Sequence, residues 1–125
     1  MSRQTSILLI DDDPVHLQIY RMIVETAGFK GIPVLVSFRG ITLPQDEPID
    51  AVLLDYRLAP NISTIEVVQQ VRGFYPGVPI LLLSDLFAAP DDIAPLVQAF
   101  VRKGNPEMLL ESLRALIQNS EPAKL

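Results

Sequence analysis

The sequence predicts a three-layer α/β domain, in which helices cover both faces of a doubly wound, five-stranded parallel sheet. Short, almost continuous apolar runs recur along the chain, as is typical of strands buried on both faces. Apolar residues at helical spacing separate most of these runs. Strands that alternate with helices favour a parallel sheet with right-handed crossovers, and we expect the strand order 2-1-3-4-5.

Composition narrows the class of protein. The 125 residues predict a single domain over residues 1–125, with a core of residues 6–118. The chain has no cysteine, which excludes disulfides, thiolate chemistry and zinc–thiolate sites. A formal net charge of −5 with scattered basic residues argues against nucleic-acid binding by this chain. The apolar runs are too short to span a bilayer and no signal-peptide pattern opens the chain, so we expect no membrane association and a cytoplasmic location.

The first predicted strand covers residues 6–10 and ends at three carboxylates, which Pro14 follows. Pro14 has no amide hydrogen to donate, so it suits the first turn of a helix. Apolar spacing extends this helix over residues 14–27, and Gly28 is typical of a helix C-terminus. His16, the only histidine, falls on or beside the buried face, and we expect it to pack at the edge of the core.

The second strand is predicted over residues 34–38. Two prolines within residues 39–50 leave room for about one helical turn at most, so the next helix is reduced. Residues 50–55 repeat the pattern of the first strand and end at the carboxylate of Asp55.

Ser63 has capping-box spacing and starts the next predicted helix, which residues 75–77 end. A fourth strand is predicted over residues 79–85, followed by a short helix that Pro95 disturbs.

The last elements are a brief fifth strand over residues 99–103, ending in Lys103, and a final helix that Asn105 caps. We expect residues 119–125 to form a frayed tail.

Polar side chains end the strands that this order makes neighbours. The first strand carries Asp11 and Asp12, and the other three end in Asp55, Ser84 and Lys103. Open α/β sheets bind ligands at this edge. Crowded carboxylates repel one another unless a cation neutralises them, and oxygen ligands suit Mg²⁺ first.

These residue types fit phosphoryl transfer. Asp12 and Asp55 can hold Mg²⁺ jointly, with Asp11 nearby through water. Asp55 can then act as a nucleophile and form an acyl phosphate, whose oxygens Ser84 and Lys103 would bind. The alternative is that each is an ordinary polar residue at a strand end.

Four segments of the chain match a known family: ILLIDDDP, VLLDYRLAP, PILLLS and FVRK. With them the chain resembles the receiver domain of two-component response regulators, which has a flavodoxin-like fold and is similar to chemotaxis regulators. The resemblance implies that Asp55 is the phosphorylated residue. It also implies that Asp11, Asp12, Asp55 and the backbone carbonyl of Arg57 hold Mg²⁺ or another divalent cation such as Mn²⁺.

The same resemblance assigns a switch and partners. It implies that Ser84 is the switch hydroxyl, Lys103 the phosphate-sensing lysine and Phe100 the aromatic switch residue. It implies a sensor histidine kinase or phosphotransfer protein as donor and an output domain or protein partner, and it allows a homodimer. Such a domain is no dedicated enzyme, although it would catalyse its own aspartyl phosphorylation and dephosphorylation.

Asp85 departs from this family, which usually has a small residue after the switch hydroxyl. A carboxylate there would modulate access to Asp55. We expect it to point outward, where it can pair with a cation such as Lys103 or Arg57.

Three further departures are Ala59, which looks like an insertion, Thr64 in place of a glycine, and Gly104 in place of a proline with a cis bond. Together with the reduced helices they motivate one alternative, a receiver-like scaffold that no longer cycles phosphate. A second alternative, suggested by the pair Asp11 and Asp13, is a haloacid dehalogenase-type phosphatase.

Overall fold

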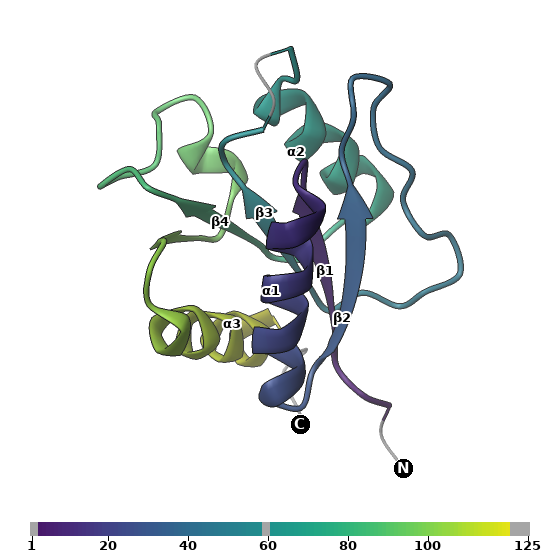
Figure 1. Cartoon of the computed structure of the whole chain (residues 1–125), viewed down its shortest axis with the longest axis vertical. Coiled ribbons are helices and arrows are strands. Elements are labelled where there is room, and N and C mark those ends of the chain that lie inside the picture. Colours follow the sequence, from purple (N-terminus) through teal and green to yellow (C-terminus); the bar gives the residue numbers. More distant parts are fainter. Residues whose placement is uncertain (1–2, 59–60, 121–125) are drawn as a thin grey trace.

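The computed structural model describes residues 3–58 and 61–120 and contains one parallel sheet of five strands in the order β2-β1-β3-β4-β5 (Figure 1). The predicted fold class and strand order are therefore confirmed. The strands are β1 (Ser6–Asp11), β2 (Lys30–Leu35), β3 (Ala51–Asp55), β4 (Ile80–Ser84) and β5 (Ala99–Arg102). The helices are α1 (Pro14–Thr26), α2 (Thr64–Phe74), α3 (Pro106–Ser120) and the single 3₁₀ turn η1 (Ala94–Leu96).

Helices cover the sheet on both faces. Successive strand residues point to opposite faces, so β1 contributes Ile7 and Leu9 to one core and Leu8 and Ile10 to the other. α1 and α3 cover the first core, whereas α2 covers the second (Figure 1). Every residue of β1, β3 and β4 is buried, which explains why these strands are continuous apolar runs rather than alternating ones.

The second strand is shifted toward the N-terminus from the predicted residues 34–38. β2 begins at Lys30 and pairs with β1 along its whole length, from Ser6 opposite Lys30 to Asp11 opposite Leu35. This strand is at the edge of the sheet, where Pro33 is tolerated because the missing amide donor faces no further strand. Its burial alternates only partly, so it lacks the apolar run that marks the central strands.

The predicted helices differ from the structure mainly in their lengths. No described residue between 36 and 50 is helical, as the two prolines led us to expect. The short helix disturbed by Pro95 is present only as η1. α3 continues to Ser120, because Leu116 and Ile117 pack against the core, and the predicted tail therefore begins too early. Residues 121–125 and Ala59 lie outside the described residues.

Candidate functional site

The site is built on two carboxylates that end neighbouring strands. The ladder between β1 and β3 pairs Ile10 with Leu54, so the next residues, Asp11 and Asp55, are level with each other. Residues in register on parallel strands point to the same side of the sheet. Both side chains are almost fully buried, with exposed fractions of 0% for Asp11 and 2% for Asp55. Two acids therefore share one buried space at the carboxyl edge.

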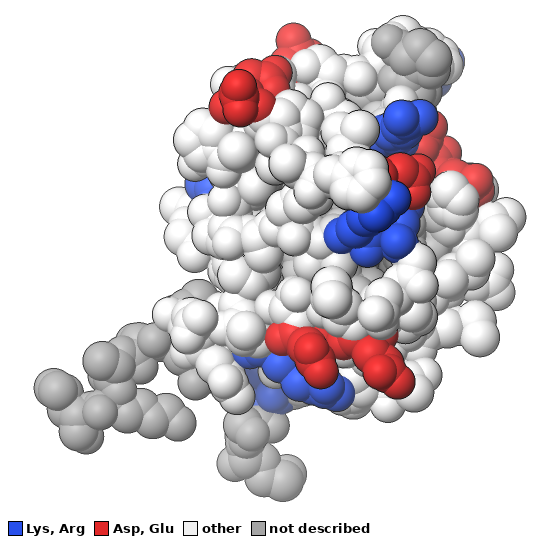
Figure 2. All heavy atoms as spheres, turned by 90° about the vertical axis from the view of Figure 1, so that its left-hand side faces the viewer, with Lys and Arg blue, Asp and Glu red and all other residues white. Residues whose placement is uncertain are grey.

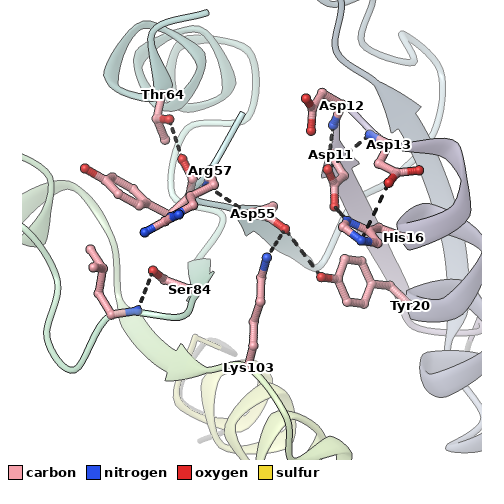
Figure 3. A network of polar contacts seen from close by, with 12 residues as sticks. Asp11, Asp12, Asp13, His16, Tyr20, Asp55, Arg57, Thr64, Ser84 and Lys103 are labelled. Carbon is pink, nitrogen blue, oxygen red and sulfur yellow. Dashed lines mark hydrogen bonds and ion pairs between the residues drawn. The ribbon is translucent and has the colours of Figure 1, made fainter. Parts of the chain in front are cut away.

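Backbone amides hold the Asp11 carboxylate. Its Oδ1 accepts hydrogen bonds from the amides of Asp12 and Asp13, at 2.7 and 3.1 Å (Figure 3). These amides belong to the turn between β1 and α1. The turn thus supplies donors where a buried carboxylate needs them.

The Asp55 carboxylate is held on both oxygens. Its Oδ1 accepts the amide hydrogen of Arg57 at 2.8 Å. Its Oδ2 lies 2.8 Å from Nζ of Lys103 and 3.4 Å from the hydroxyl of Tyr20, which donates to it (Figure 3). The structure thus brings Lys103 from the end of β5 to the acid at the end of β3, as the sequence led us to expect.

Asp12 lies differently from our expectation. The carboxylates of Asp11 and Asp55 and a ring nitrogen of His16 lie within 4.8 Å of one another, and Asp12 is outside this group. Figure 3 shows the Asp12 carboxylate turned away from Asp55. Asp12 is one residue beyond the end of β1, so it does not share the orientation of Asp11. Its role as a metal ligand, like that of the Arg57 carbonyl, stays a prediction.

Sequence reasoning did not find His16 and Tyr20 as members of the site. His16 Nδ1 lies 3.2 Å from Oδ2 of Asp11, so the ring is in contact with the acids instead of only packing at the core edge. Tyr20 follows one helical turn later and reaches Asp55. One feature of the sequence could have indicated that His16 lies near the acids. Asp13 and His16 are three residues apart across the start of a helix, and this spacing places their side chains on the same side of the helix.

Ser84 ends β4 and is fully buried. Its Oγ accepts the amide hydrogen of Leu86 at 3.0 Å, and its own hydroxyl hydrogen can be donated to another group. Phe100 is half-buried in β5, opposite Leu82 of β4, and packs against the core on the α2 side.

The departures from the family have clear local structures. Asp85 is exposed, as expected, but within residues 3–58 and 61–120 it forms no ion pair, and Lys103 is paired with Asp55 instead. The Thr64 hydroxyl donates to the Tyr56 carbonyl at 2.7 Å and ties the start of α2 to the loop after β3. Gly104 has a φ of 107°, which glycine adopts without strain, and no cis bond occurs in the described part of the chain.

Negative charge dominates the electrostatics of the site. Burial, followed by the neighbouring carboxyl groups of Asp12 and Asp55, raises the pKa of Asp11 from 3.8 to about 7, against the lowering effect of the Asp13 amide. Burial, followed by the charges of Asp55 and Asp11, also raises the pKa of Tyr20. The residues present fit a divalent cation, because it would neutralise two buried carboxylates that are close enough to share it.

The surface has no extended basic region on the face shown in Figure 2, where basic side chains lie next to acidic ones. This mixed surface agrees with the formal net charge of −5. Among the helices that the structure describes, none is both long enough and apolar enough to cross a membrane.

The chain is similar to response regulators in sequence. It is 29% identical over 119 residues to the probable transcriptional regulatory protein TcrX of Mycobacterium tuberculosis, covering 92% of this chain and 50% of the relative. It is 30% identical over 130 residues to the response regulator MprA of the same species, covering 93% of this chain and 52% of the relative. The chain thus spans about half the length of these relatives. No family model matches it.

Solved receiver structures have the same fold. A receiver domain protein from Methanospirillum hungatei superposes with a TM-score of 0.76 at 19% identity, covering 94% of this chain and 97% of that one. The response regulator TrrA of Thermotoga maritima, solved with Mg²⁺ and BeF, gives a TM-score of 0.72 at 23% identity, covering 90% and 99%. In sequence, then, this chain is similar to response regulators, and its fold is that of their solved receiver domains.

We expect the metal-free domain to lose stability as the pH rises from about 5 to about 8, relative to an Asp11→Asn variant. The folded state keeps the Asp11 proton until about pH 7, whereas the unfolded chain releases it near 3.8. The folded state therefore binds more protons in this window, and the free energy of unfolding falls as they are lost. Urea unfolding followed by circular dichroism measures it. If the free energies of unfolding of the two proteins change with pH in the same way, the raised pKa of Asp11 is contradicted.

Proposed function

We propose that this domain accepts a phosphoryl group on Asp55 and signals through the change that the added charge produces. The observation that carries the proposal is the Asp55 carboxylate itself. It is buried at a strand end, level with a second acid, and 2.8 Å from the Lys103 ammonium. A buried acid with a cation beside it is placed to receive an anionic group and to have the new charge neutralised.

The donor would be a phosphohistidine on a sensor histidine kinase or a phosphotransfer protein. An oxygen of Asp55 attacks the phosphorus, so that an O–P bond forms as the N–P bond breaks. The leaving imidazole of the donor takes up a proton. We propose Asp11 and Asp55 as ligands of Mg²⁺ or Mn²⁺, with Asp12 and the Arg57 carbonyl as further ligands. When bound, the cation offsets the repulsion between the carboxylate and the incoming group.

Lys103 and Ser84 would bind the oxygens of the phosphoryl group. The Lys103 ammonium is already beside Oδ2 of Asp55 and can follow the negative charge to the phosphoryl oxygens. Ser84 can donate its hydroxyl hydrogen to one of these oxygens. Because its Oγ also accepts from the Leu86 amide, movement of Ser84 would shift the loop after β4. Phe100, on the adjacent strand, would change its packing in response.

The relatives suggest where the signal goes. One is named a transcriptional regulatory protein and another a response regulator, and each is about twice the length of this chain. We therefore propose that the phosphorylated receiver passes its signal to an output domain or a protein partner. A homodimer of the receiver can take part in this step. Partners of this kind act on DNA, which favours a cytoplasmic location.

A scaffold that no longer cycles phosphate is the second candidate. The observation that favours it is the loss of helical structure: η1 replaces a full helix before β5, and the described residues 36–50 contain no helix. A face that usually changes on phosphorylation would then be altered. The two candidates differ in whether Asp55 takes up phosphate.

Incubation with acetyl phosphate and Mg²⁺ should add the mass of one phosphoryl group to the intact chain. Asp55→Asn should abolish this increase, because the amide is not a nucleophile for phosphorus. Asp91→Asn is the matched control, since this aspartate is exposed and lies outside the site. Intact-mass spectrometry measures the outcome. An increase that survives in Asp55→Asn, or phosphate located on Ser84, would refute the assignment.

Asp85→Ala should change the phosphorylation rate only a few-fold. Asp85 is exposed, so solvent screens its charge from the acids of the site. Asp85→Asn, which keeps the shape and removes the charge, is the companion variant. The rate of mass increase with acetyl phosphate is the measurement. An acceleration of about a hundredfold or more in both variants, equivalent to roughly 2.7 kcal/mol, would instead favour the scaffold.

A further inference from the structure

We infer that His16 is a ligand of the cation and makes the site prefer a divalent first-row transition ion to Mg²⁺. The inference rests on the cation site of the proposed function and deepens it. A ring nitrogen of His16 lies within 4.8 Å of carboxylate oxygens of both Asp11 and Asp55. Figure 3 shows the ring beside the Asp11 carboxylate, reaching from α1 toward the space that Asp55 enters from β3.

The two ring nitrogens face different carboxylates. Nδ1 lies 3.2 Å from Oδ2 of Asp11, inside the site. Nε2 lies 3.6 Å from Oδ2 of Asp13, outside the group of three. A metal-binding histidine usually has its second nitrogen directed at a carboxylate or carbonyl, which fixes the ring and raises its basicity. Asp13 is in place for this role.

The surroundings keep the ring and its partner in place. Oδ1 of Asp13 accepts the amide hydrogen of Val15 at 2.8 Å and caps α1, so Asp13 cannot turn freely. The ring of Tyr20, one turn further along α1, has its centroid 6.2 Å from that of His16. The His16 side chain is 45% exposed, which leaves room for water or a phosphoryl oxygen to complete the coordination.

The donor set decides which ion is preferred. Carboxylates and water suit Mg²⁺ and Mn²⁺, whereas imidazole suits Zn²⁺, Cu²⁺, Fe²⁺ and Ni²⁺. Two carboxylates and one imidazole therefore add an attraction for transition ions that a site of oxygen ligands lacks. Mg²⁺ still finds two carboxylates, so it binds but is outcompeted. Removing the imidazole should cost a transition ion more affinity than it costs Mg²⁺.

Pulsed electron paramagnetic resonance on the full chain with Mn²⁺ as the probe tests this directly. The wild-type spectrum should contain the coupling of a directly bound imidazole nitrogen. In His16→Gln that coupling should vanish, and the affinity ratio of Ni²⁺ over Mg²⁺ should fall by about tenfold or more. Asp11→Asn should greatly weaken the binding of all three ions, which locates the probe at this site. Gln18→Ala, an exposed change on the same helix, should alter neither quantity.

Absence of nitrogen coupling from wild-type Mn²⁺, absence of Mn²⁺ binding, or an equal loss of Ni²⁺ and Mg²⁺ affinity in His16→Gln would each overturn the inference. The wild-type spectrum decides even if the variant folds poorly. No phosphodonor is present, so nitrogen coupling is detectable whether or not Asp55 accepts phosphate. Conversely, phosphorylation with Mg²⁺ but without nitrogen coupling would refute the role of His16 and leave the proposed function intact.

Discussion

The register between β1 and β3 is the constraint on which the rest of this site depends. Pairing Ile10 with Leu54 makes Asp11 and Asp55 end their strands level with each other and on the same side. Both carboxylates are buried there, and the raised pKa of Asp11 is the direct result. A shift of one residue in this ladder would turn one acid to the opposite face and remove the site.

The groups around these two acids offset the repulsion between their negative charges. The turn amides hold one oxygen of Asp11, the Arg57 amide holds one oxygen of Asp55, and Lys103 supplies a positive charge from β5. α1 begins directly after the acids, so the positive end of its dipole also lies close to them. Burying two acids costs stability, and a fold that keeps such a pair indicates a chemical use for it.

Most of the fold and about half of the site geometry could be predicted from the sequence, for identifiable reasons. Strands buried on both faces are visible in the sequence as continuous apolar runs. The polar residues that end these runs are Asp11, Asp55 and Ser84, so the runs identify them as site candidates. Helix starts at Pro14 and Ser63 were equally readable because capping chemistry is local.

The features that could not be predicted depend on the register of the strands and on the orientation of α1 relative to β1. The choice between Asp11 and Asp12 as the partner of Asp55 depends on which of them ends the ladder. The position of His16 depends on the angle at which α1 leaves β1, which apolar spacing does not fix. β2 was misplaced because an edge strand that contains Pro33 has no continuous apolar run.

Titration of the isotope-labelled domain with beryllium fluoride and Mg²⁺, the pair present in the TrrA structure, tests the central claim most directly. Nuclear magnetic resonance follows the backbone amides. We expect Mg²⁺ alone to shift the Asp55 amide, and the amides of Ser84, Phe100 and Lys103 to shift only when both components are present. If saturating amounts of both leave these four amides unchanged, or if they shift equally without the cation, the acid pair is not a cation-dependent phosphoryl site.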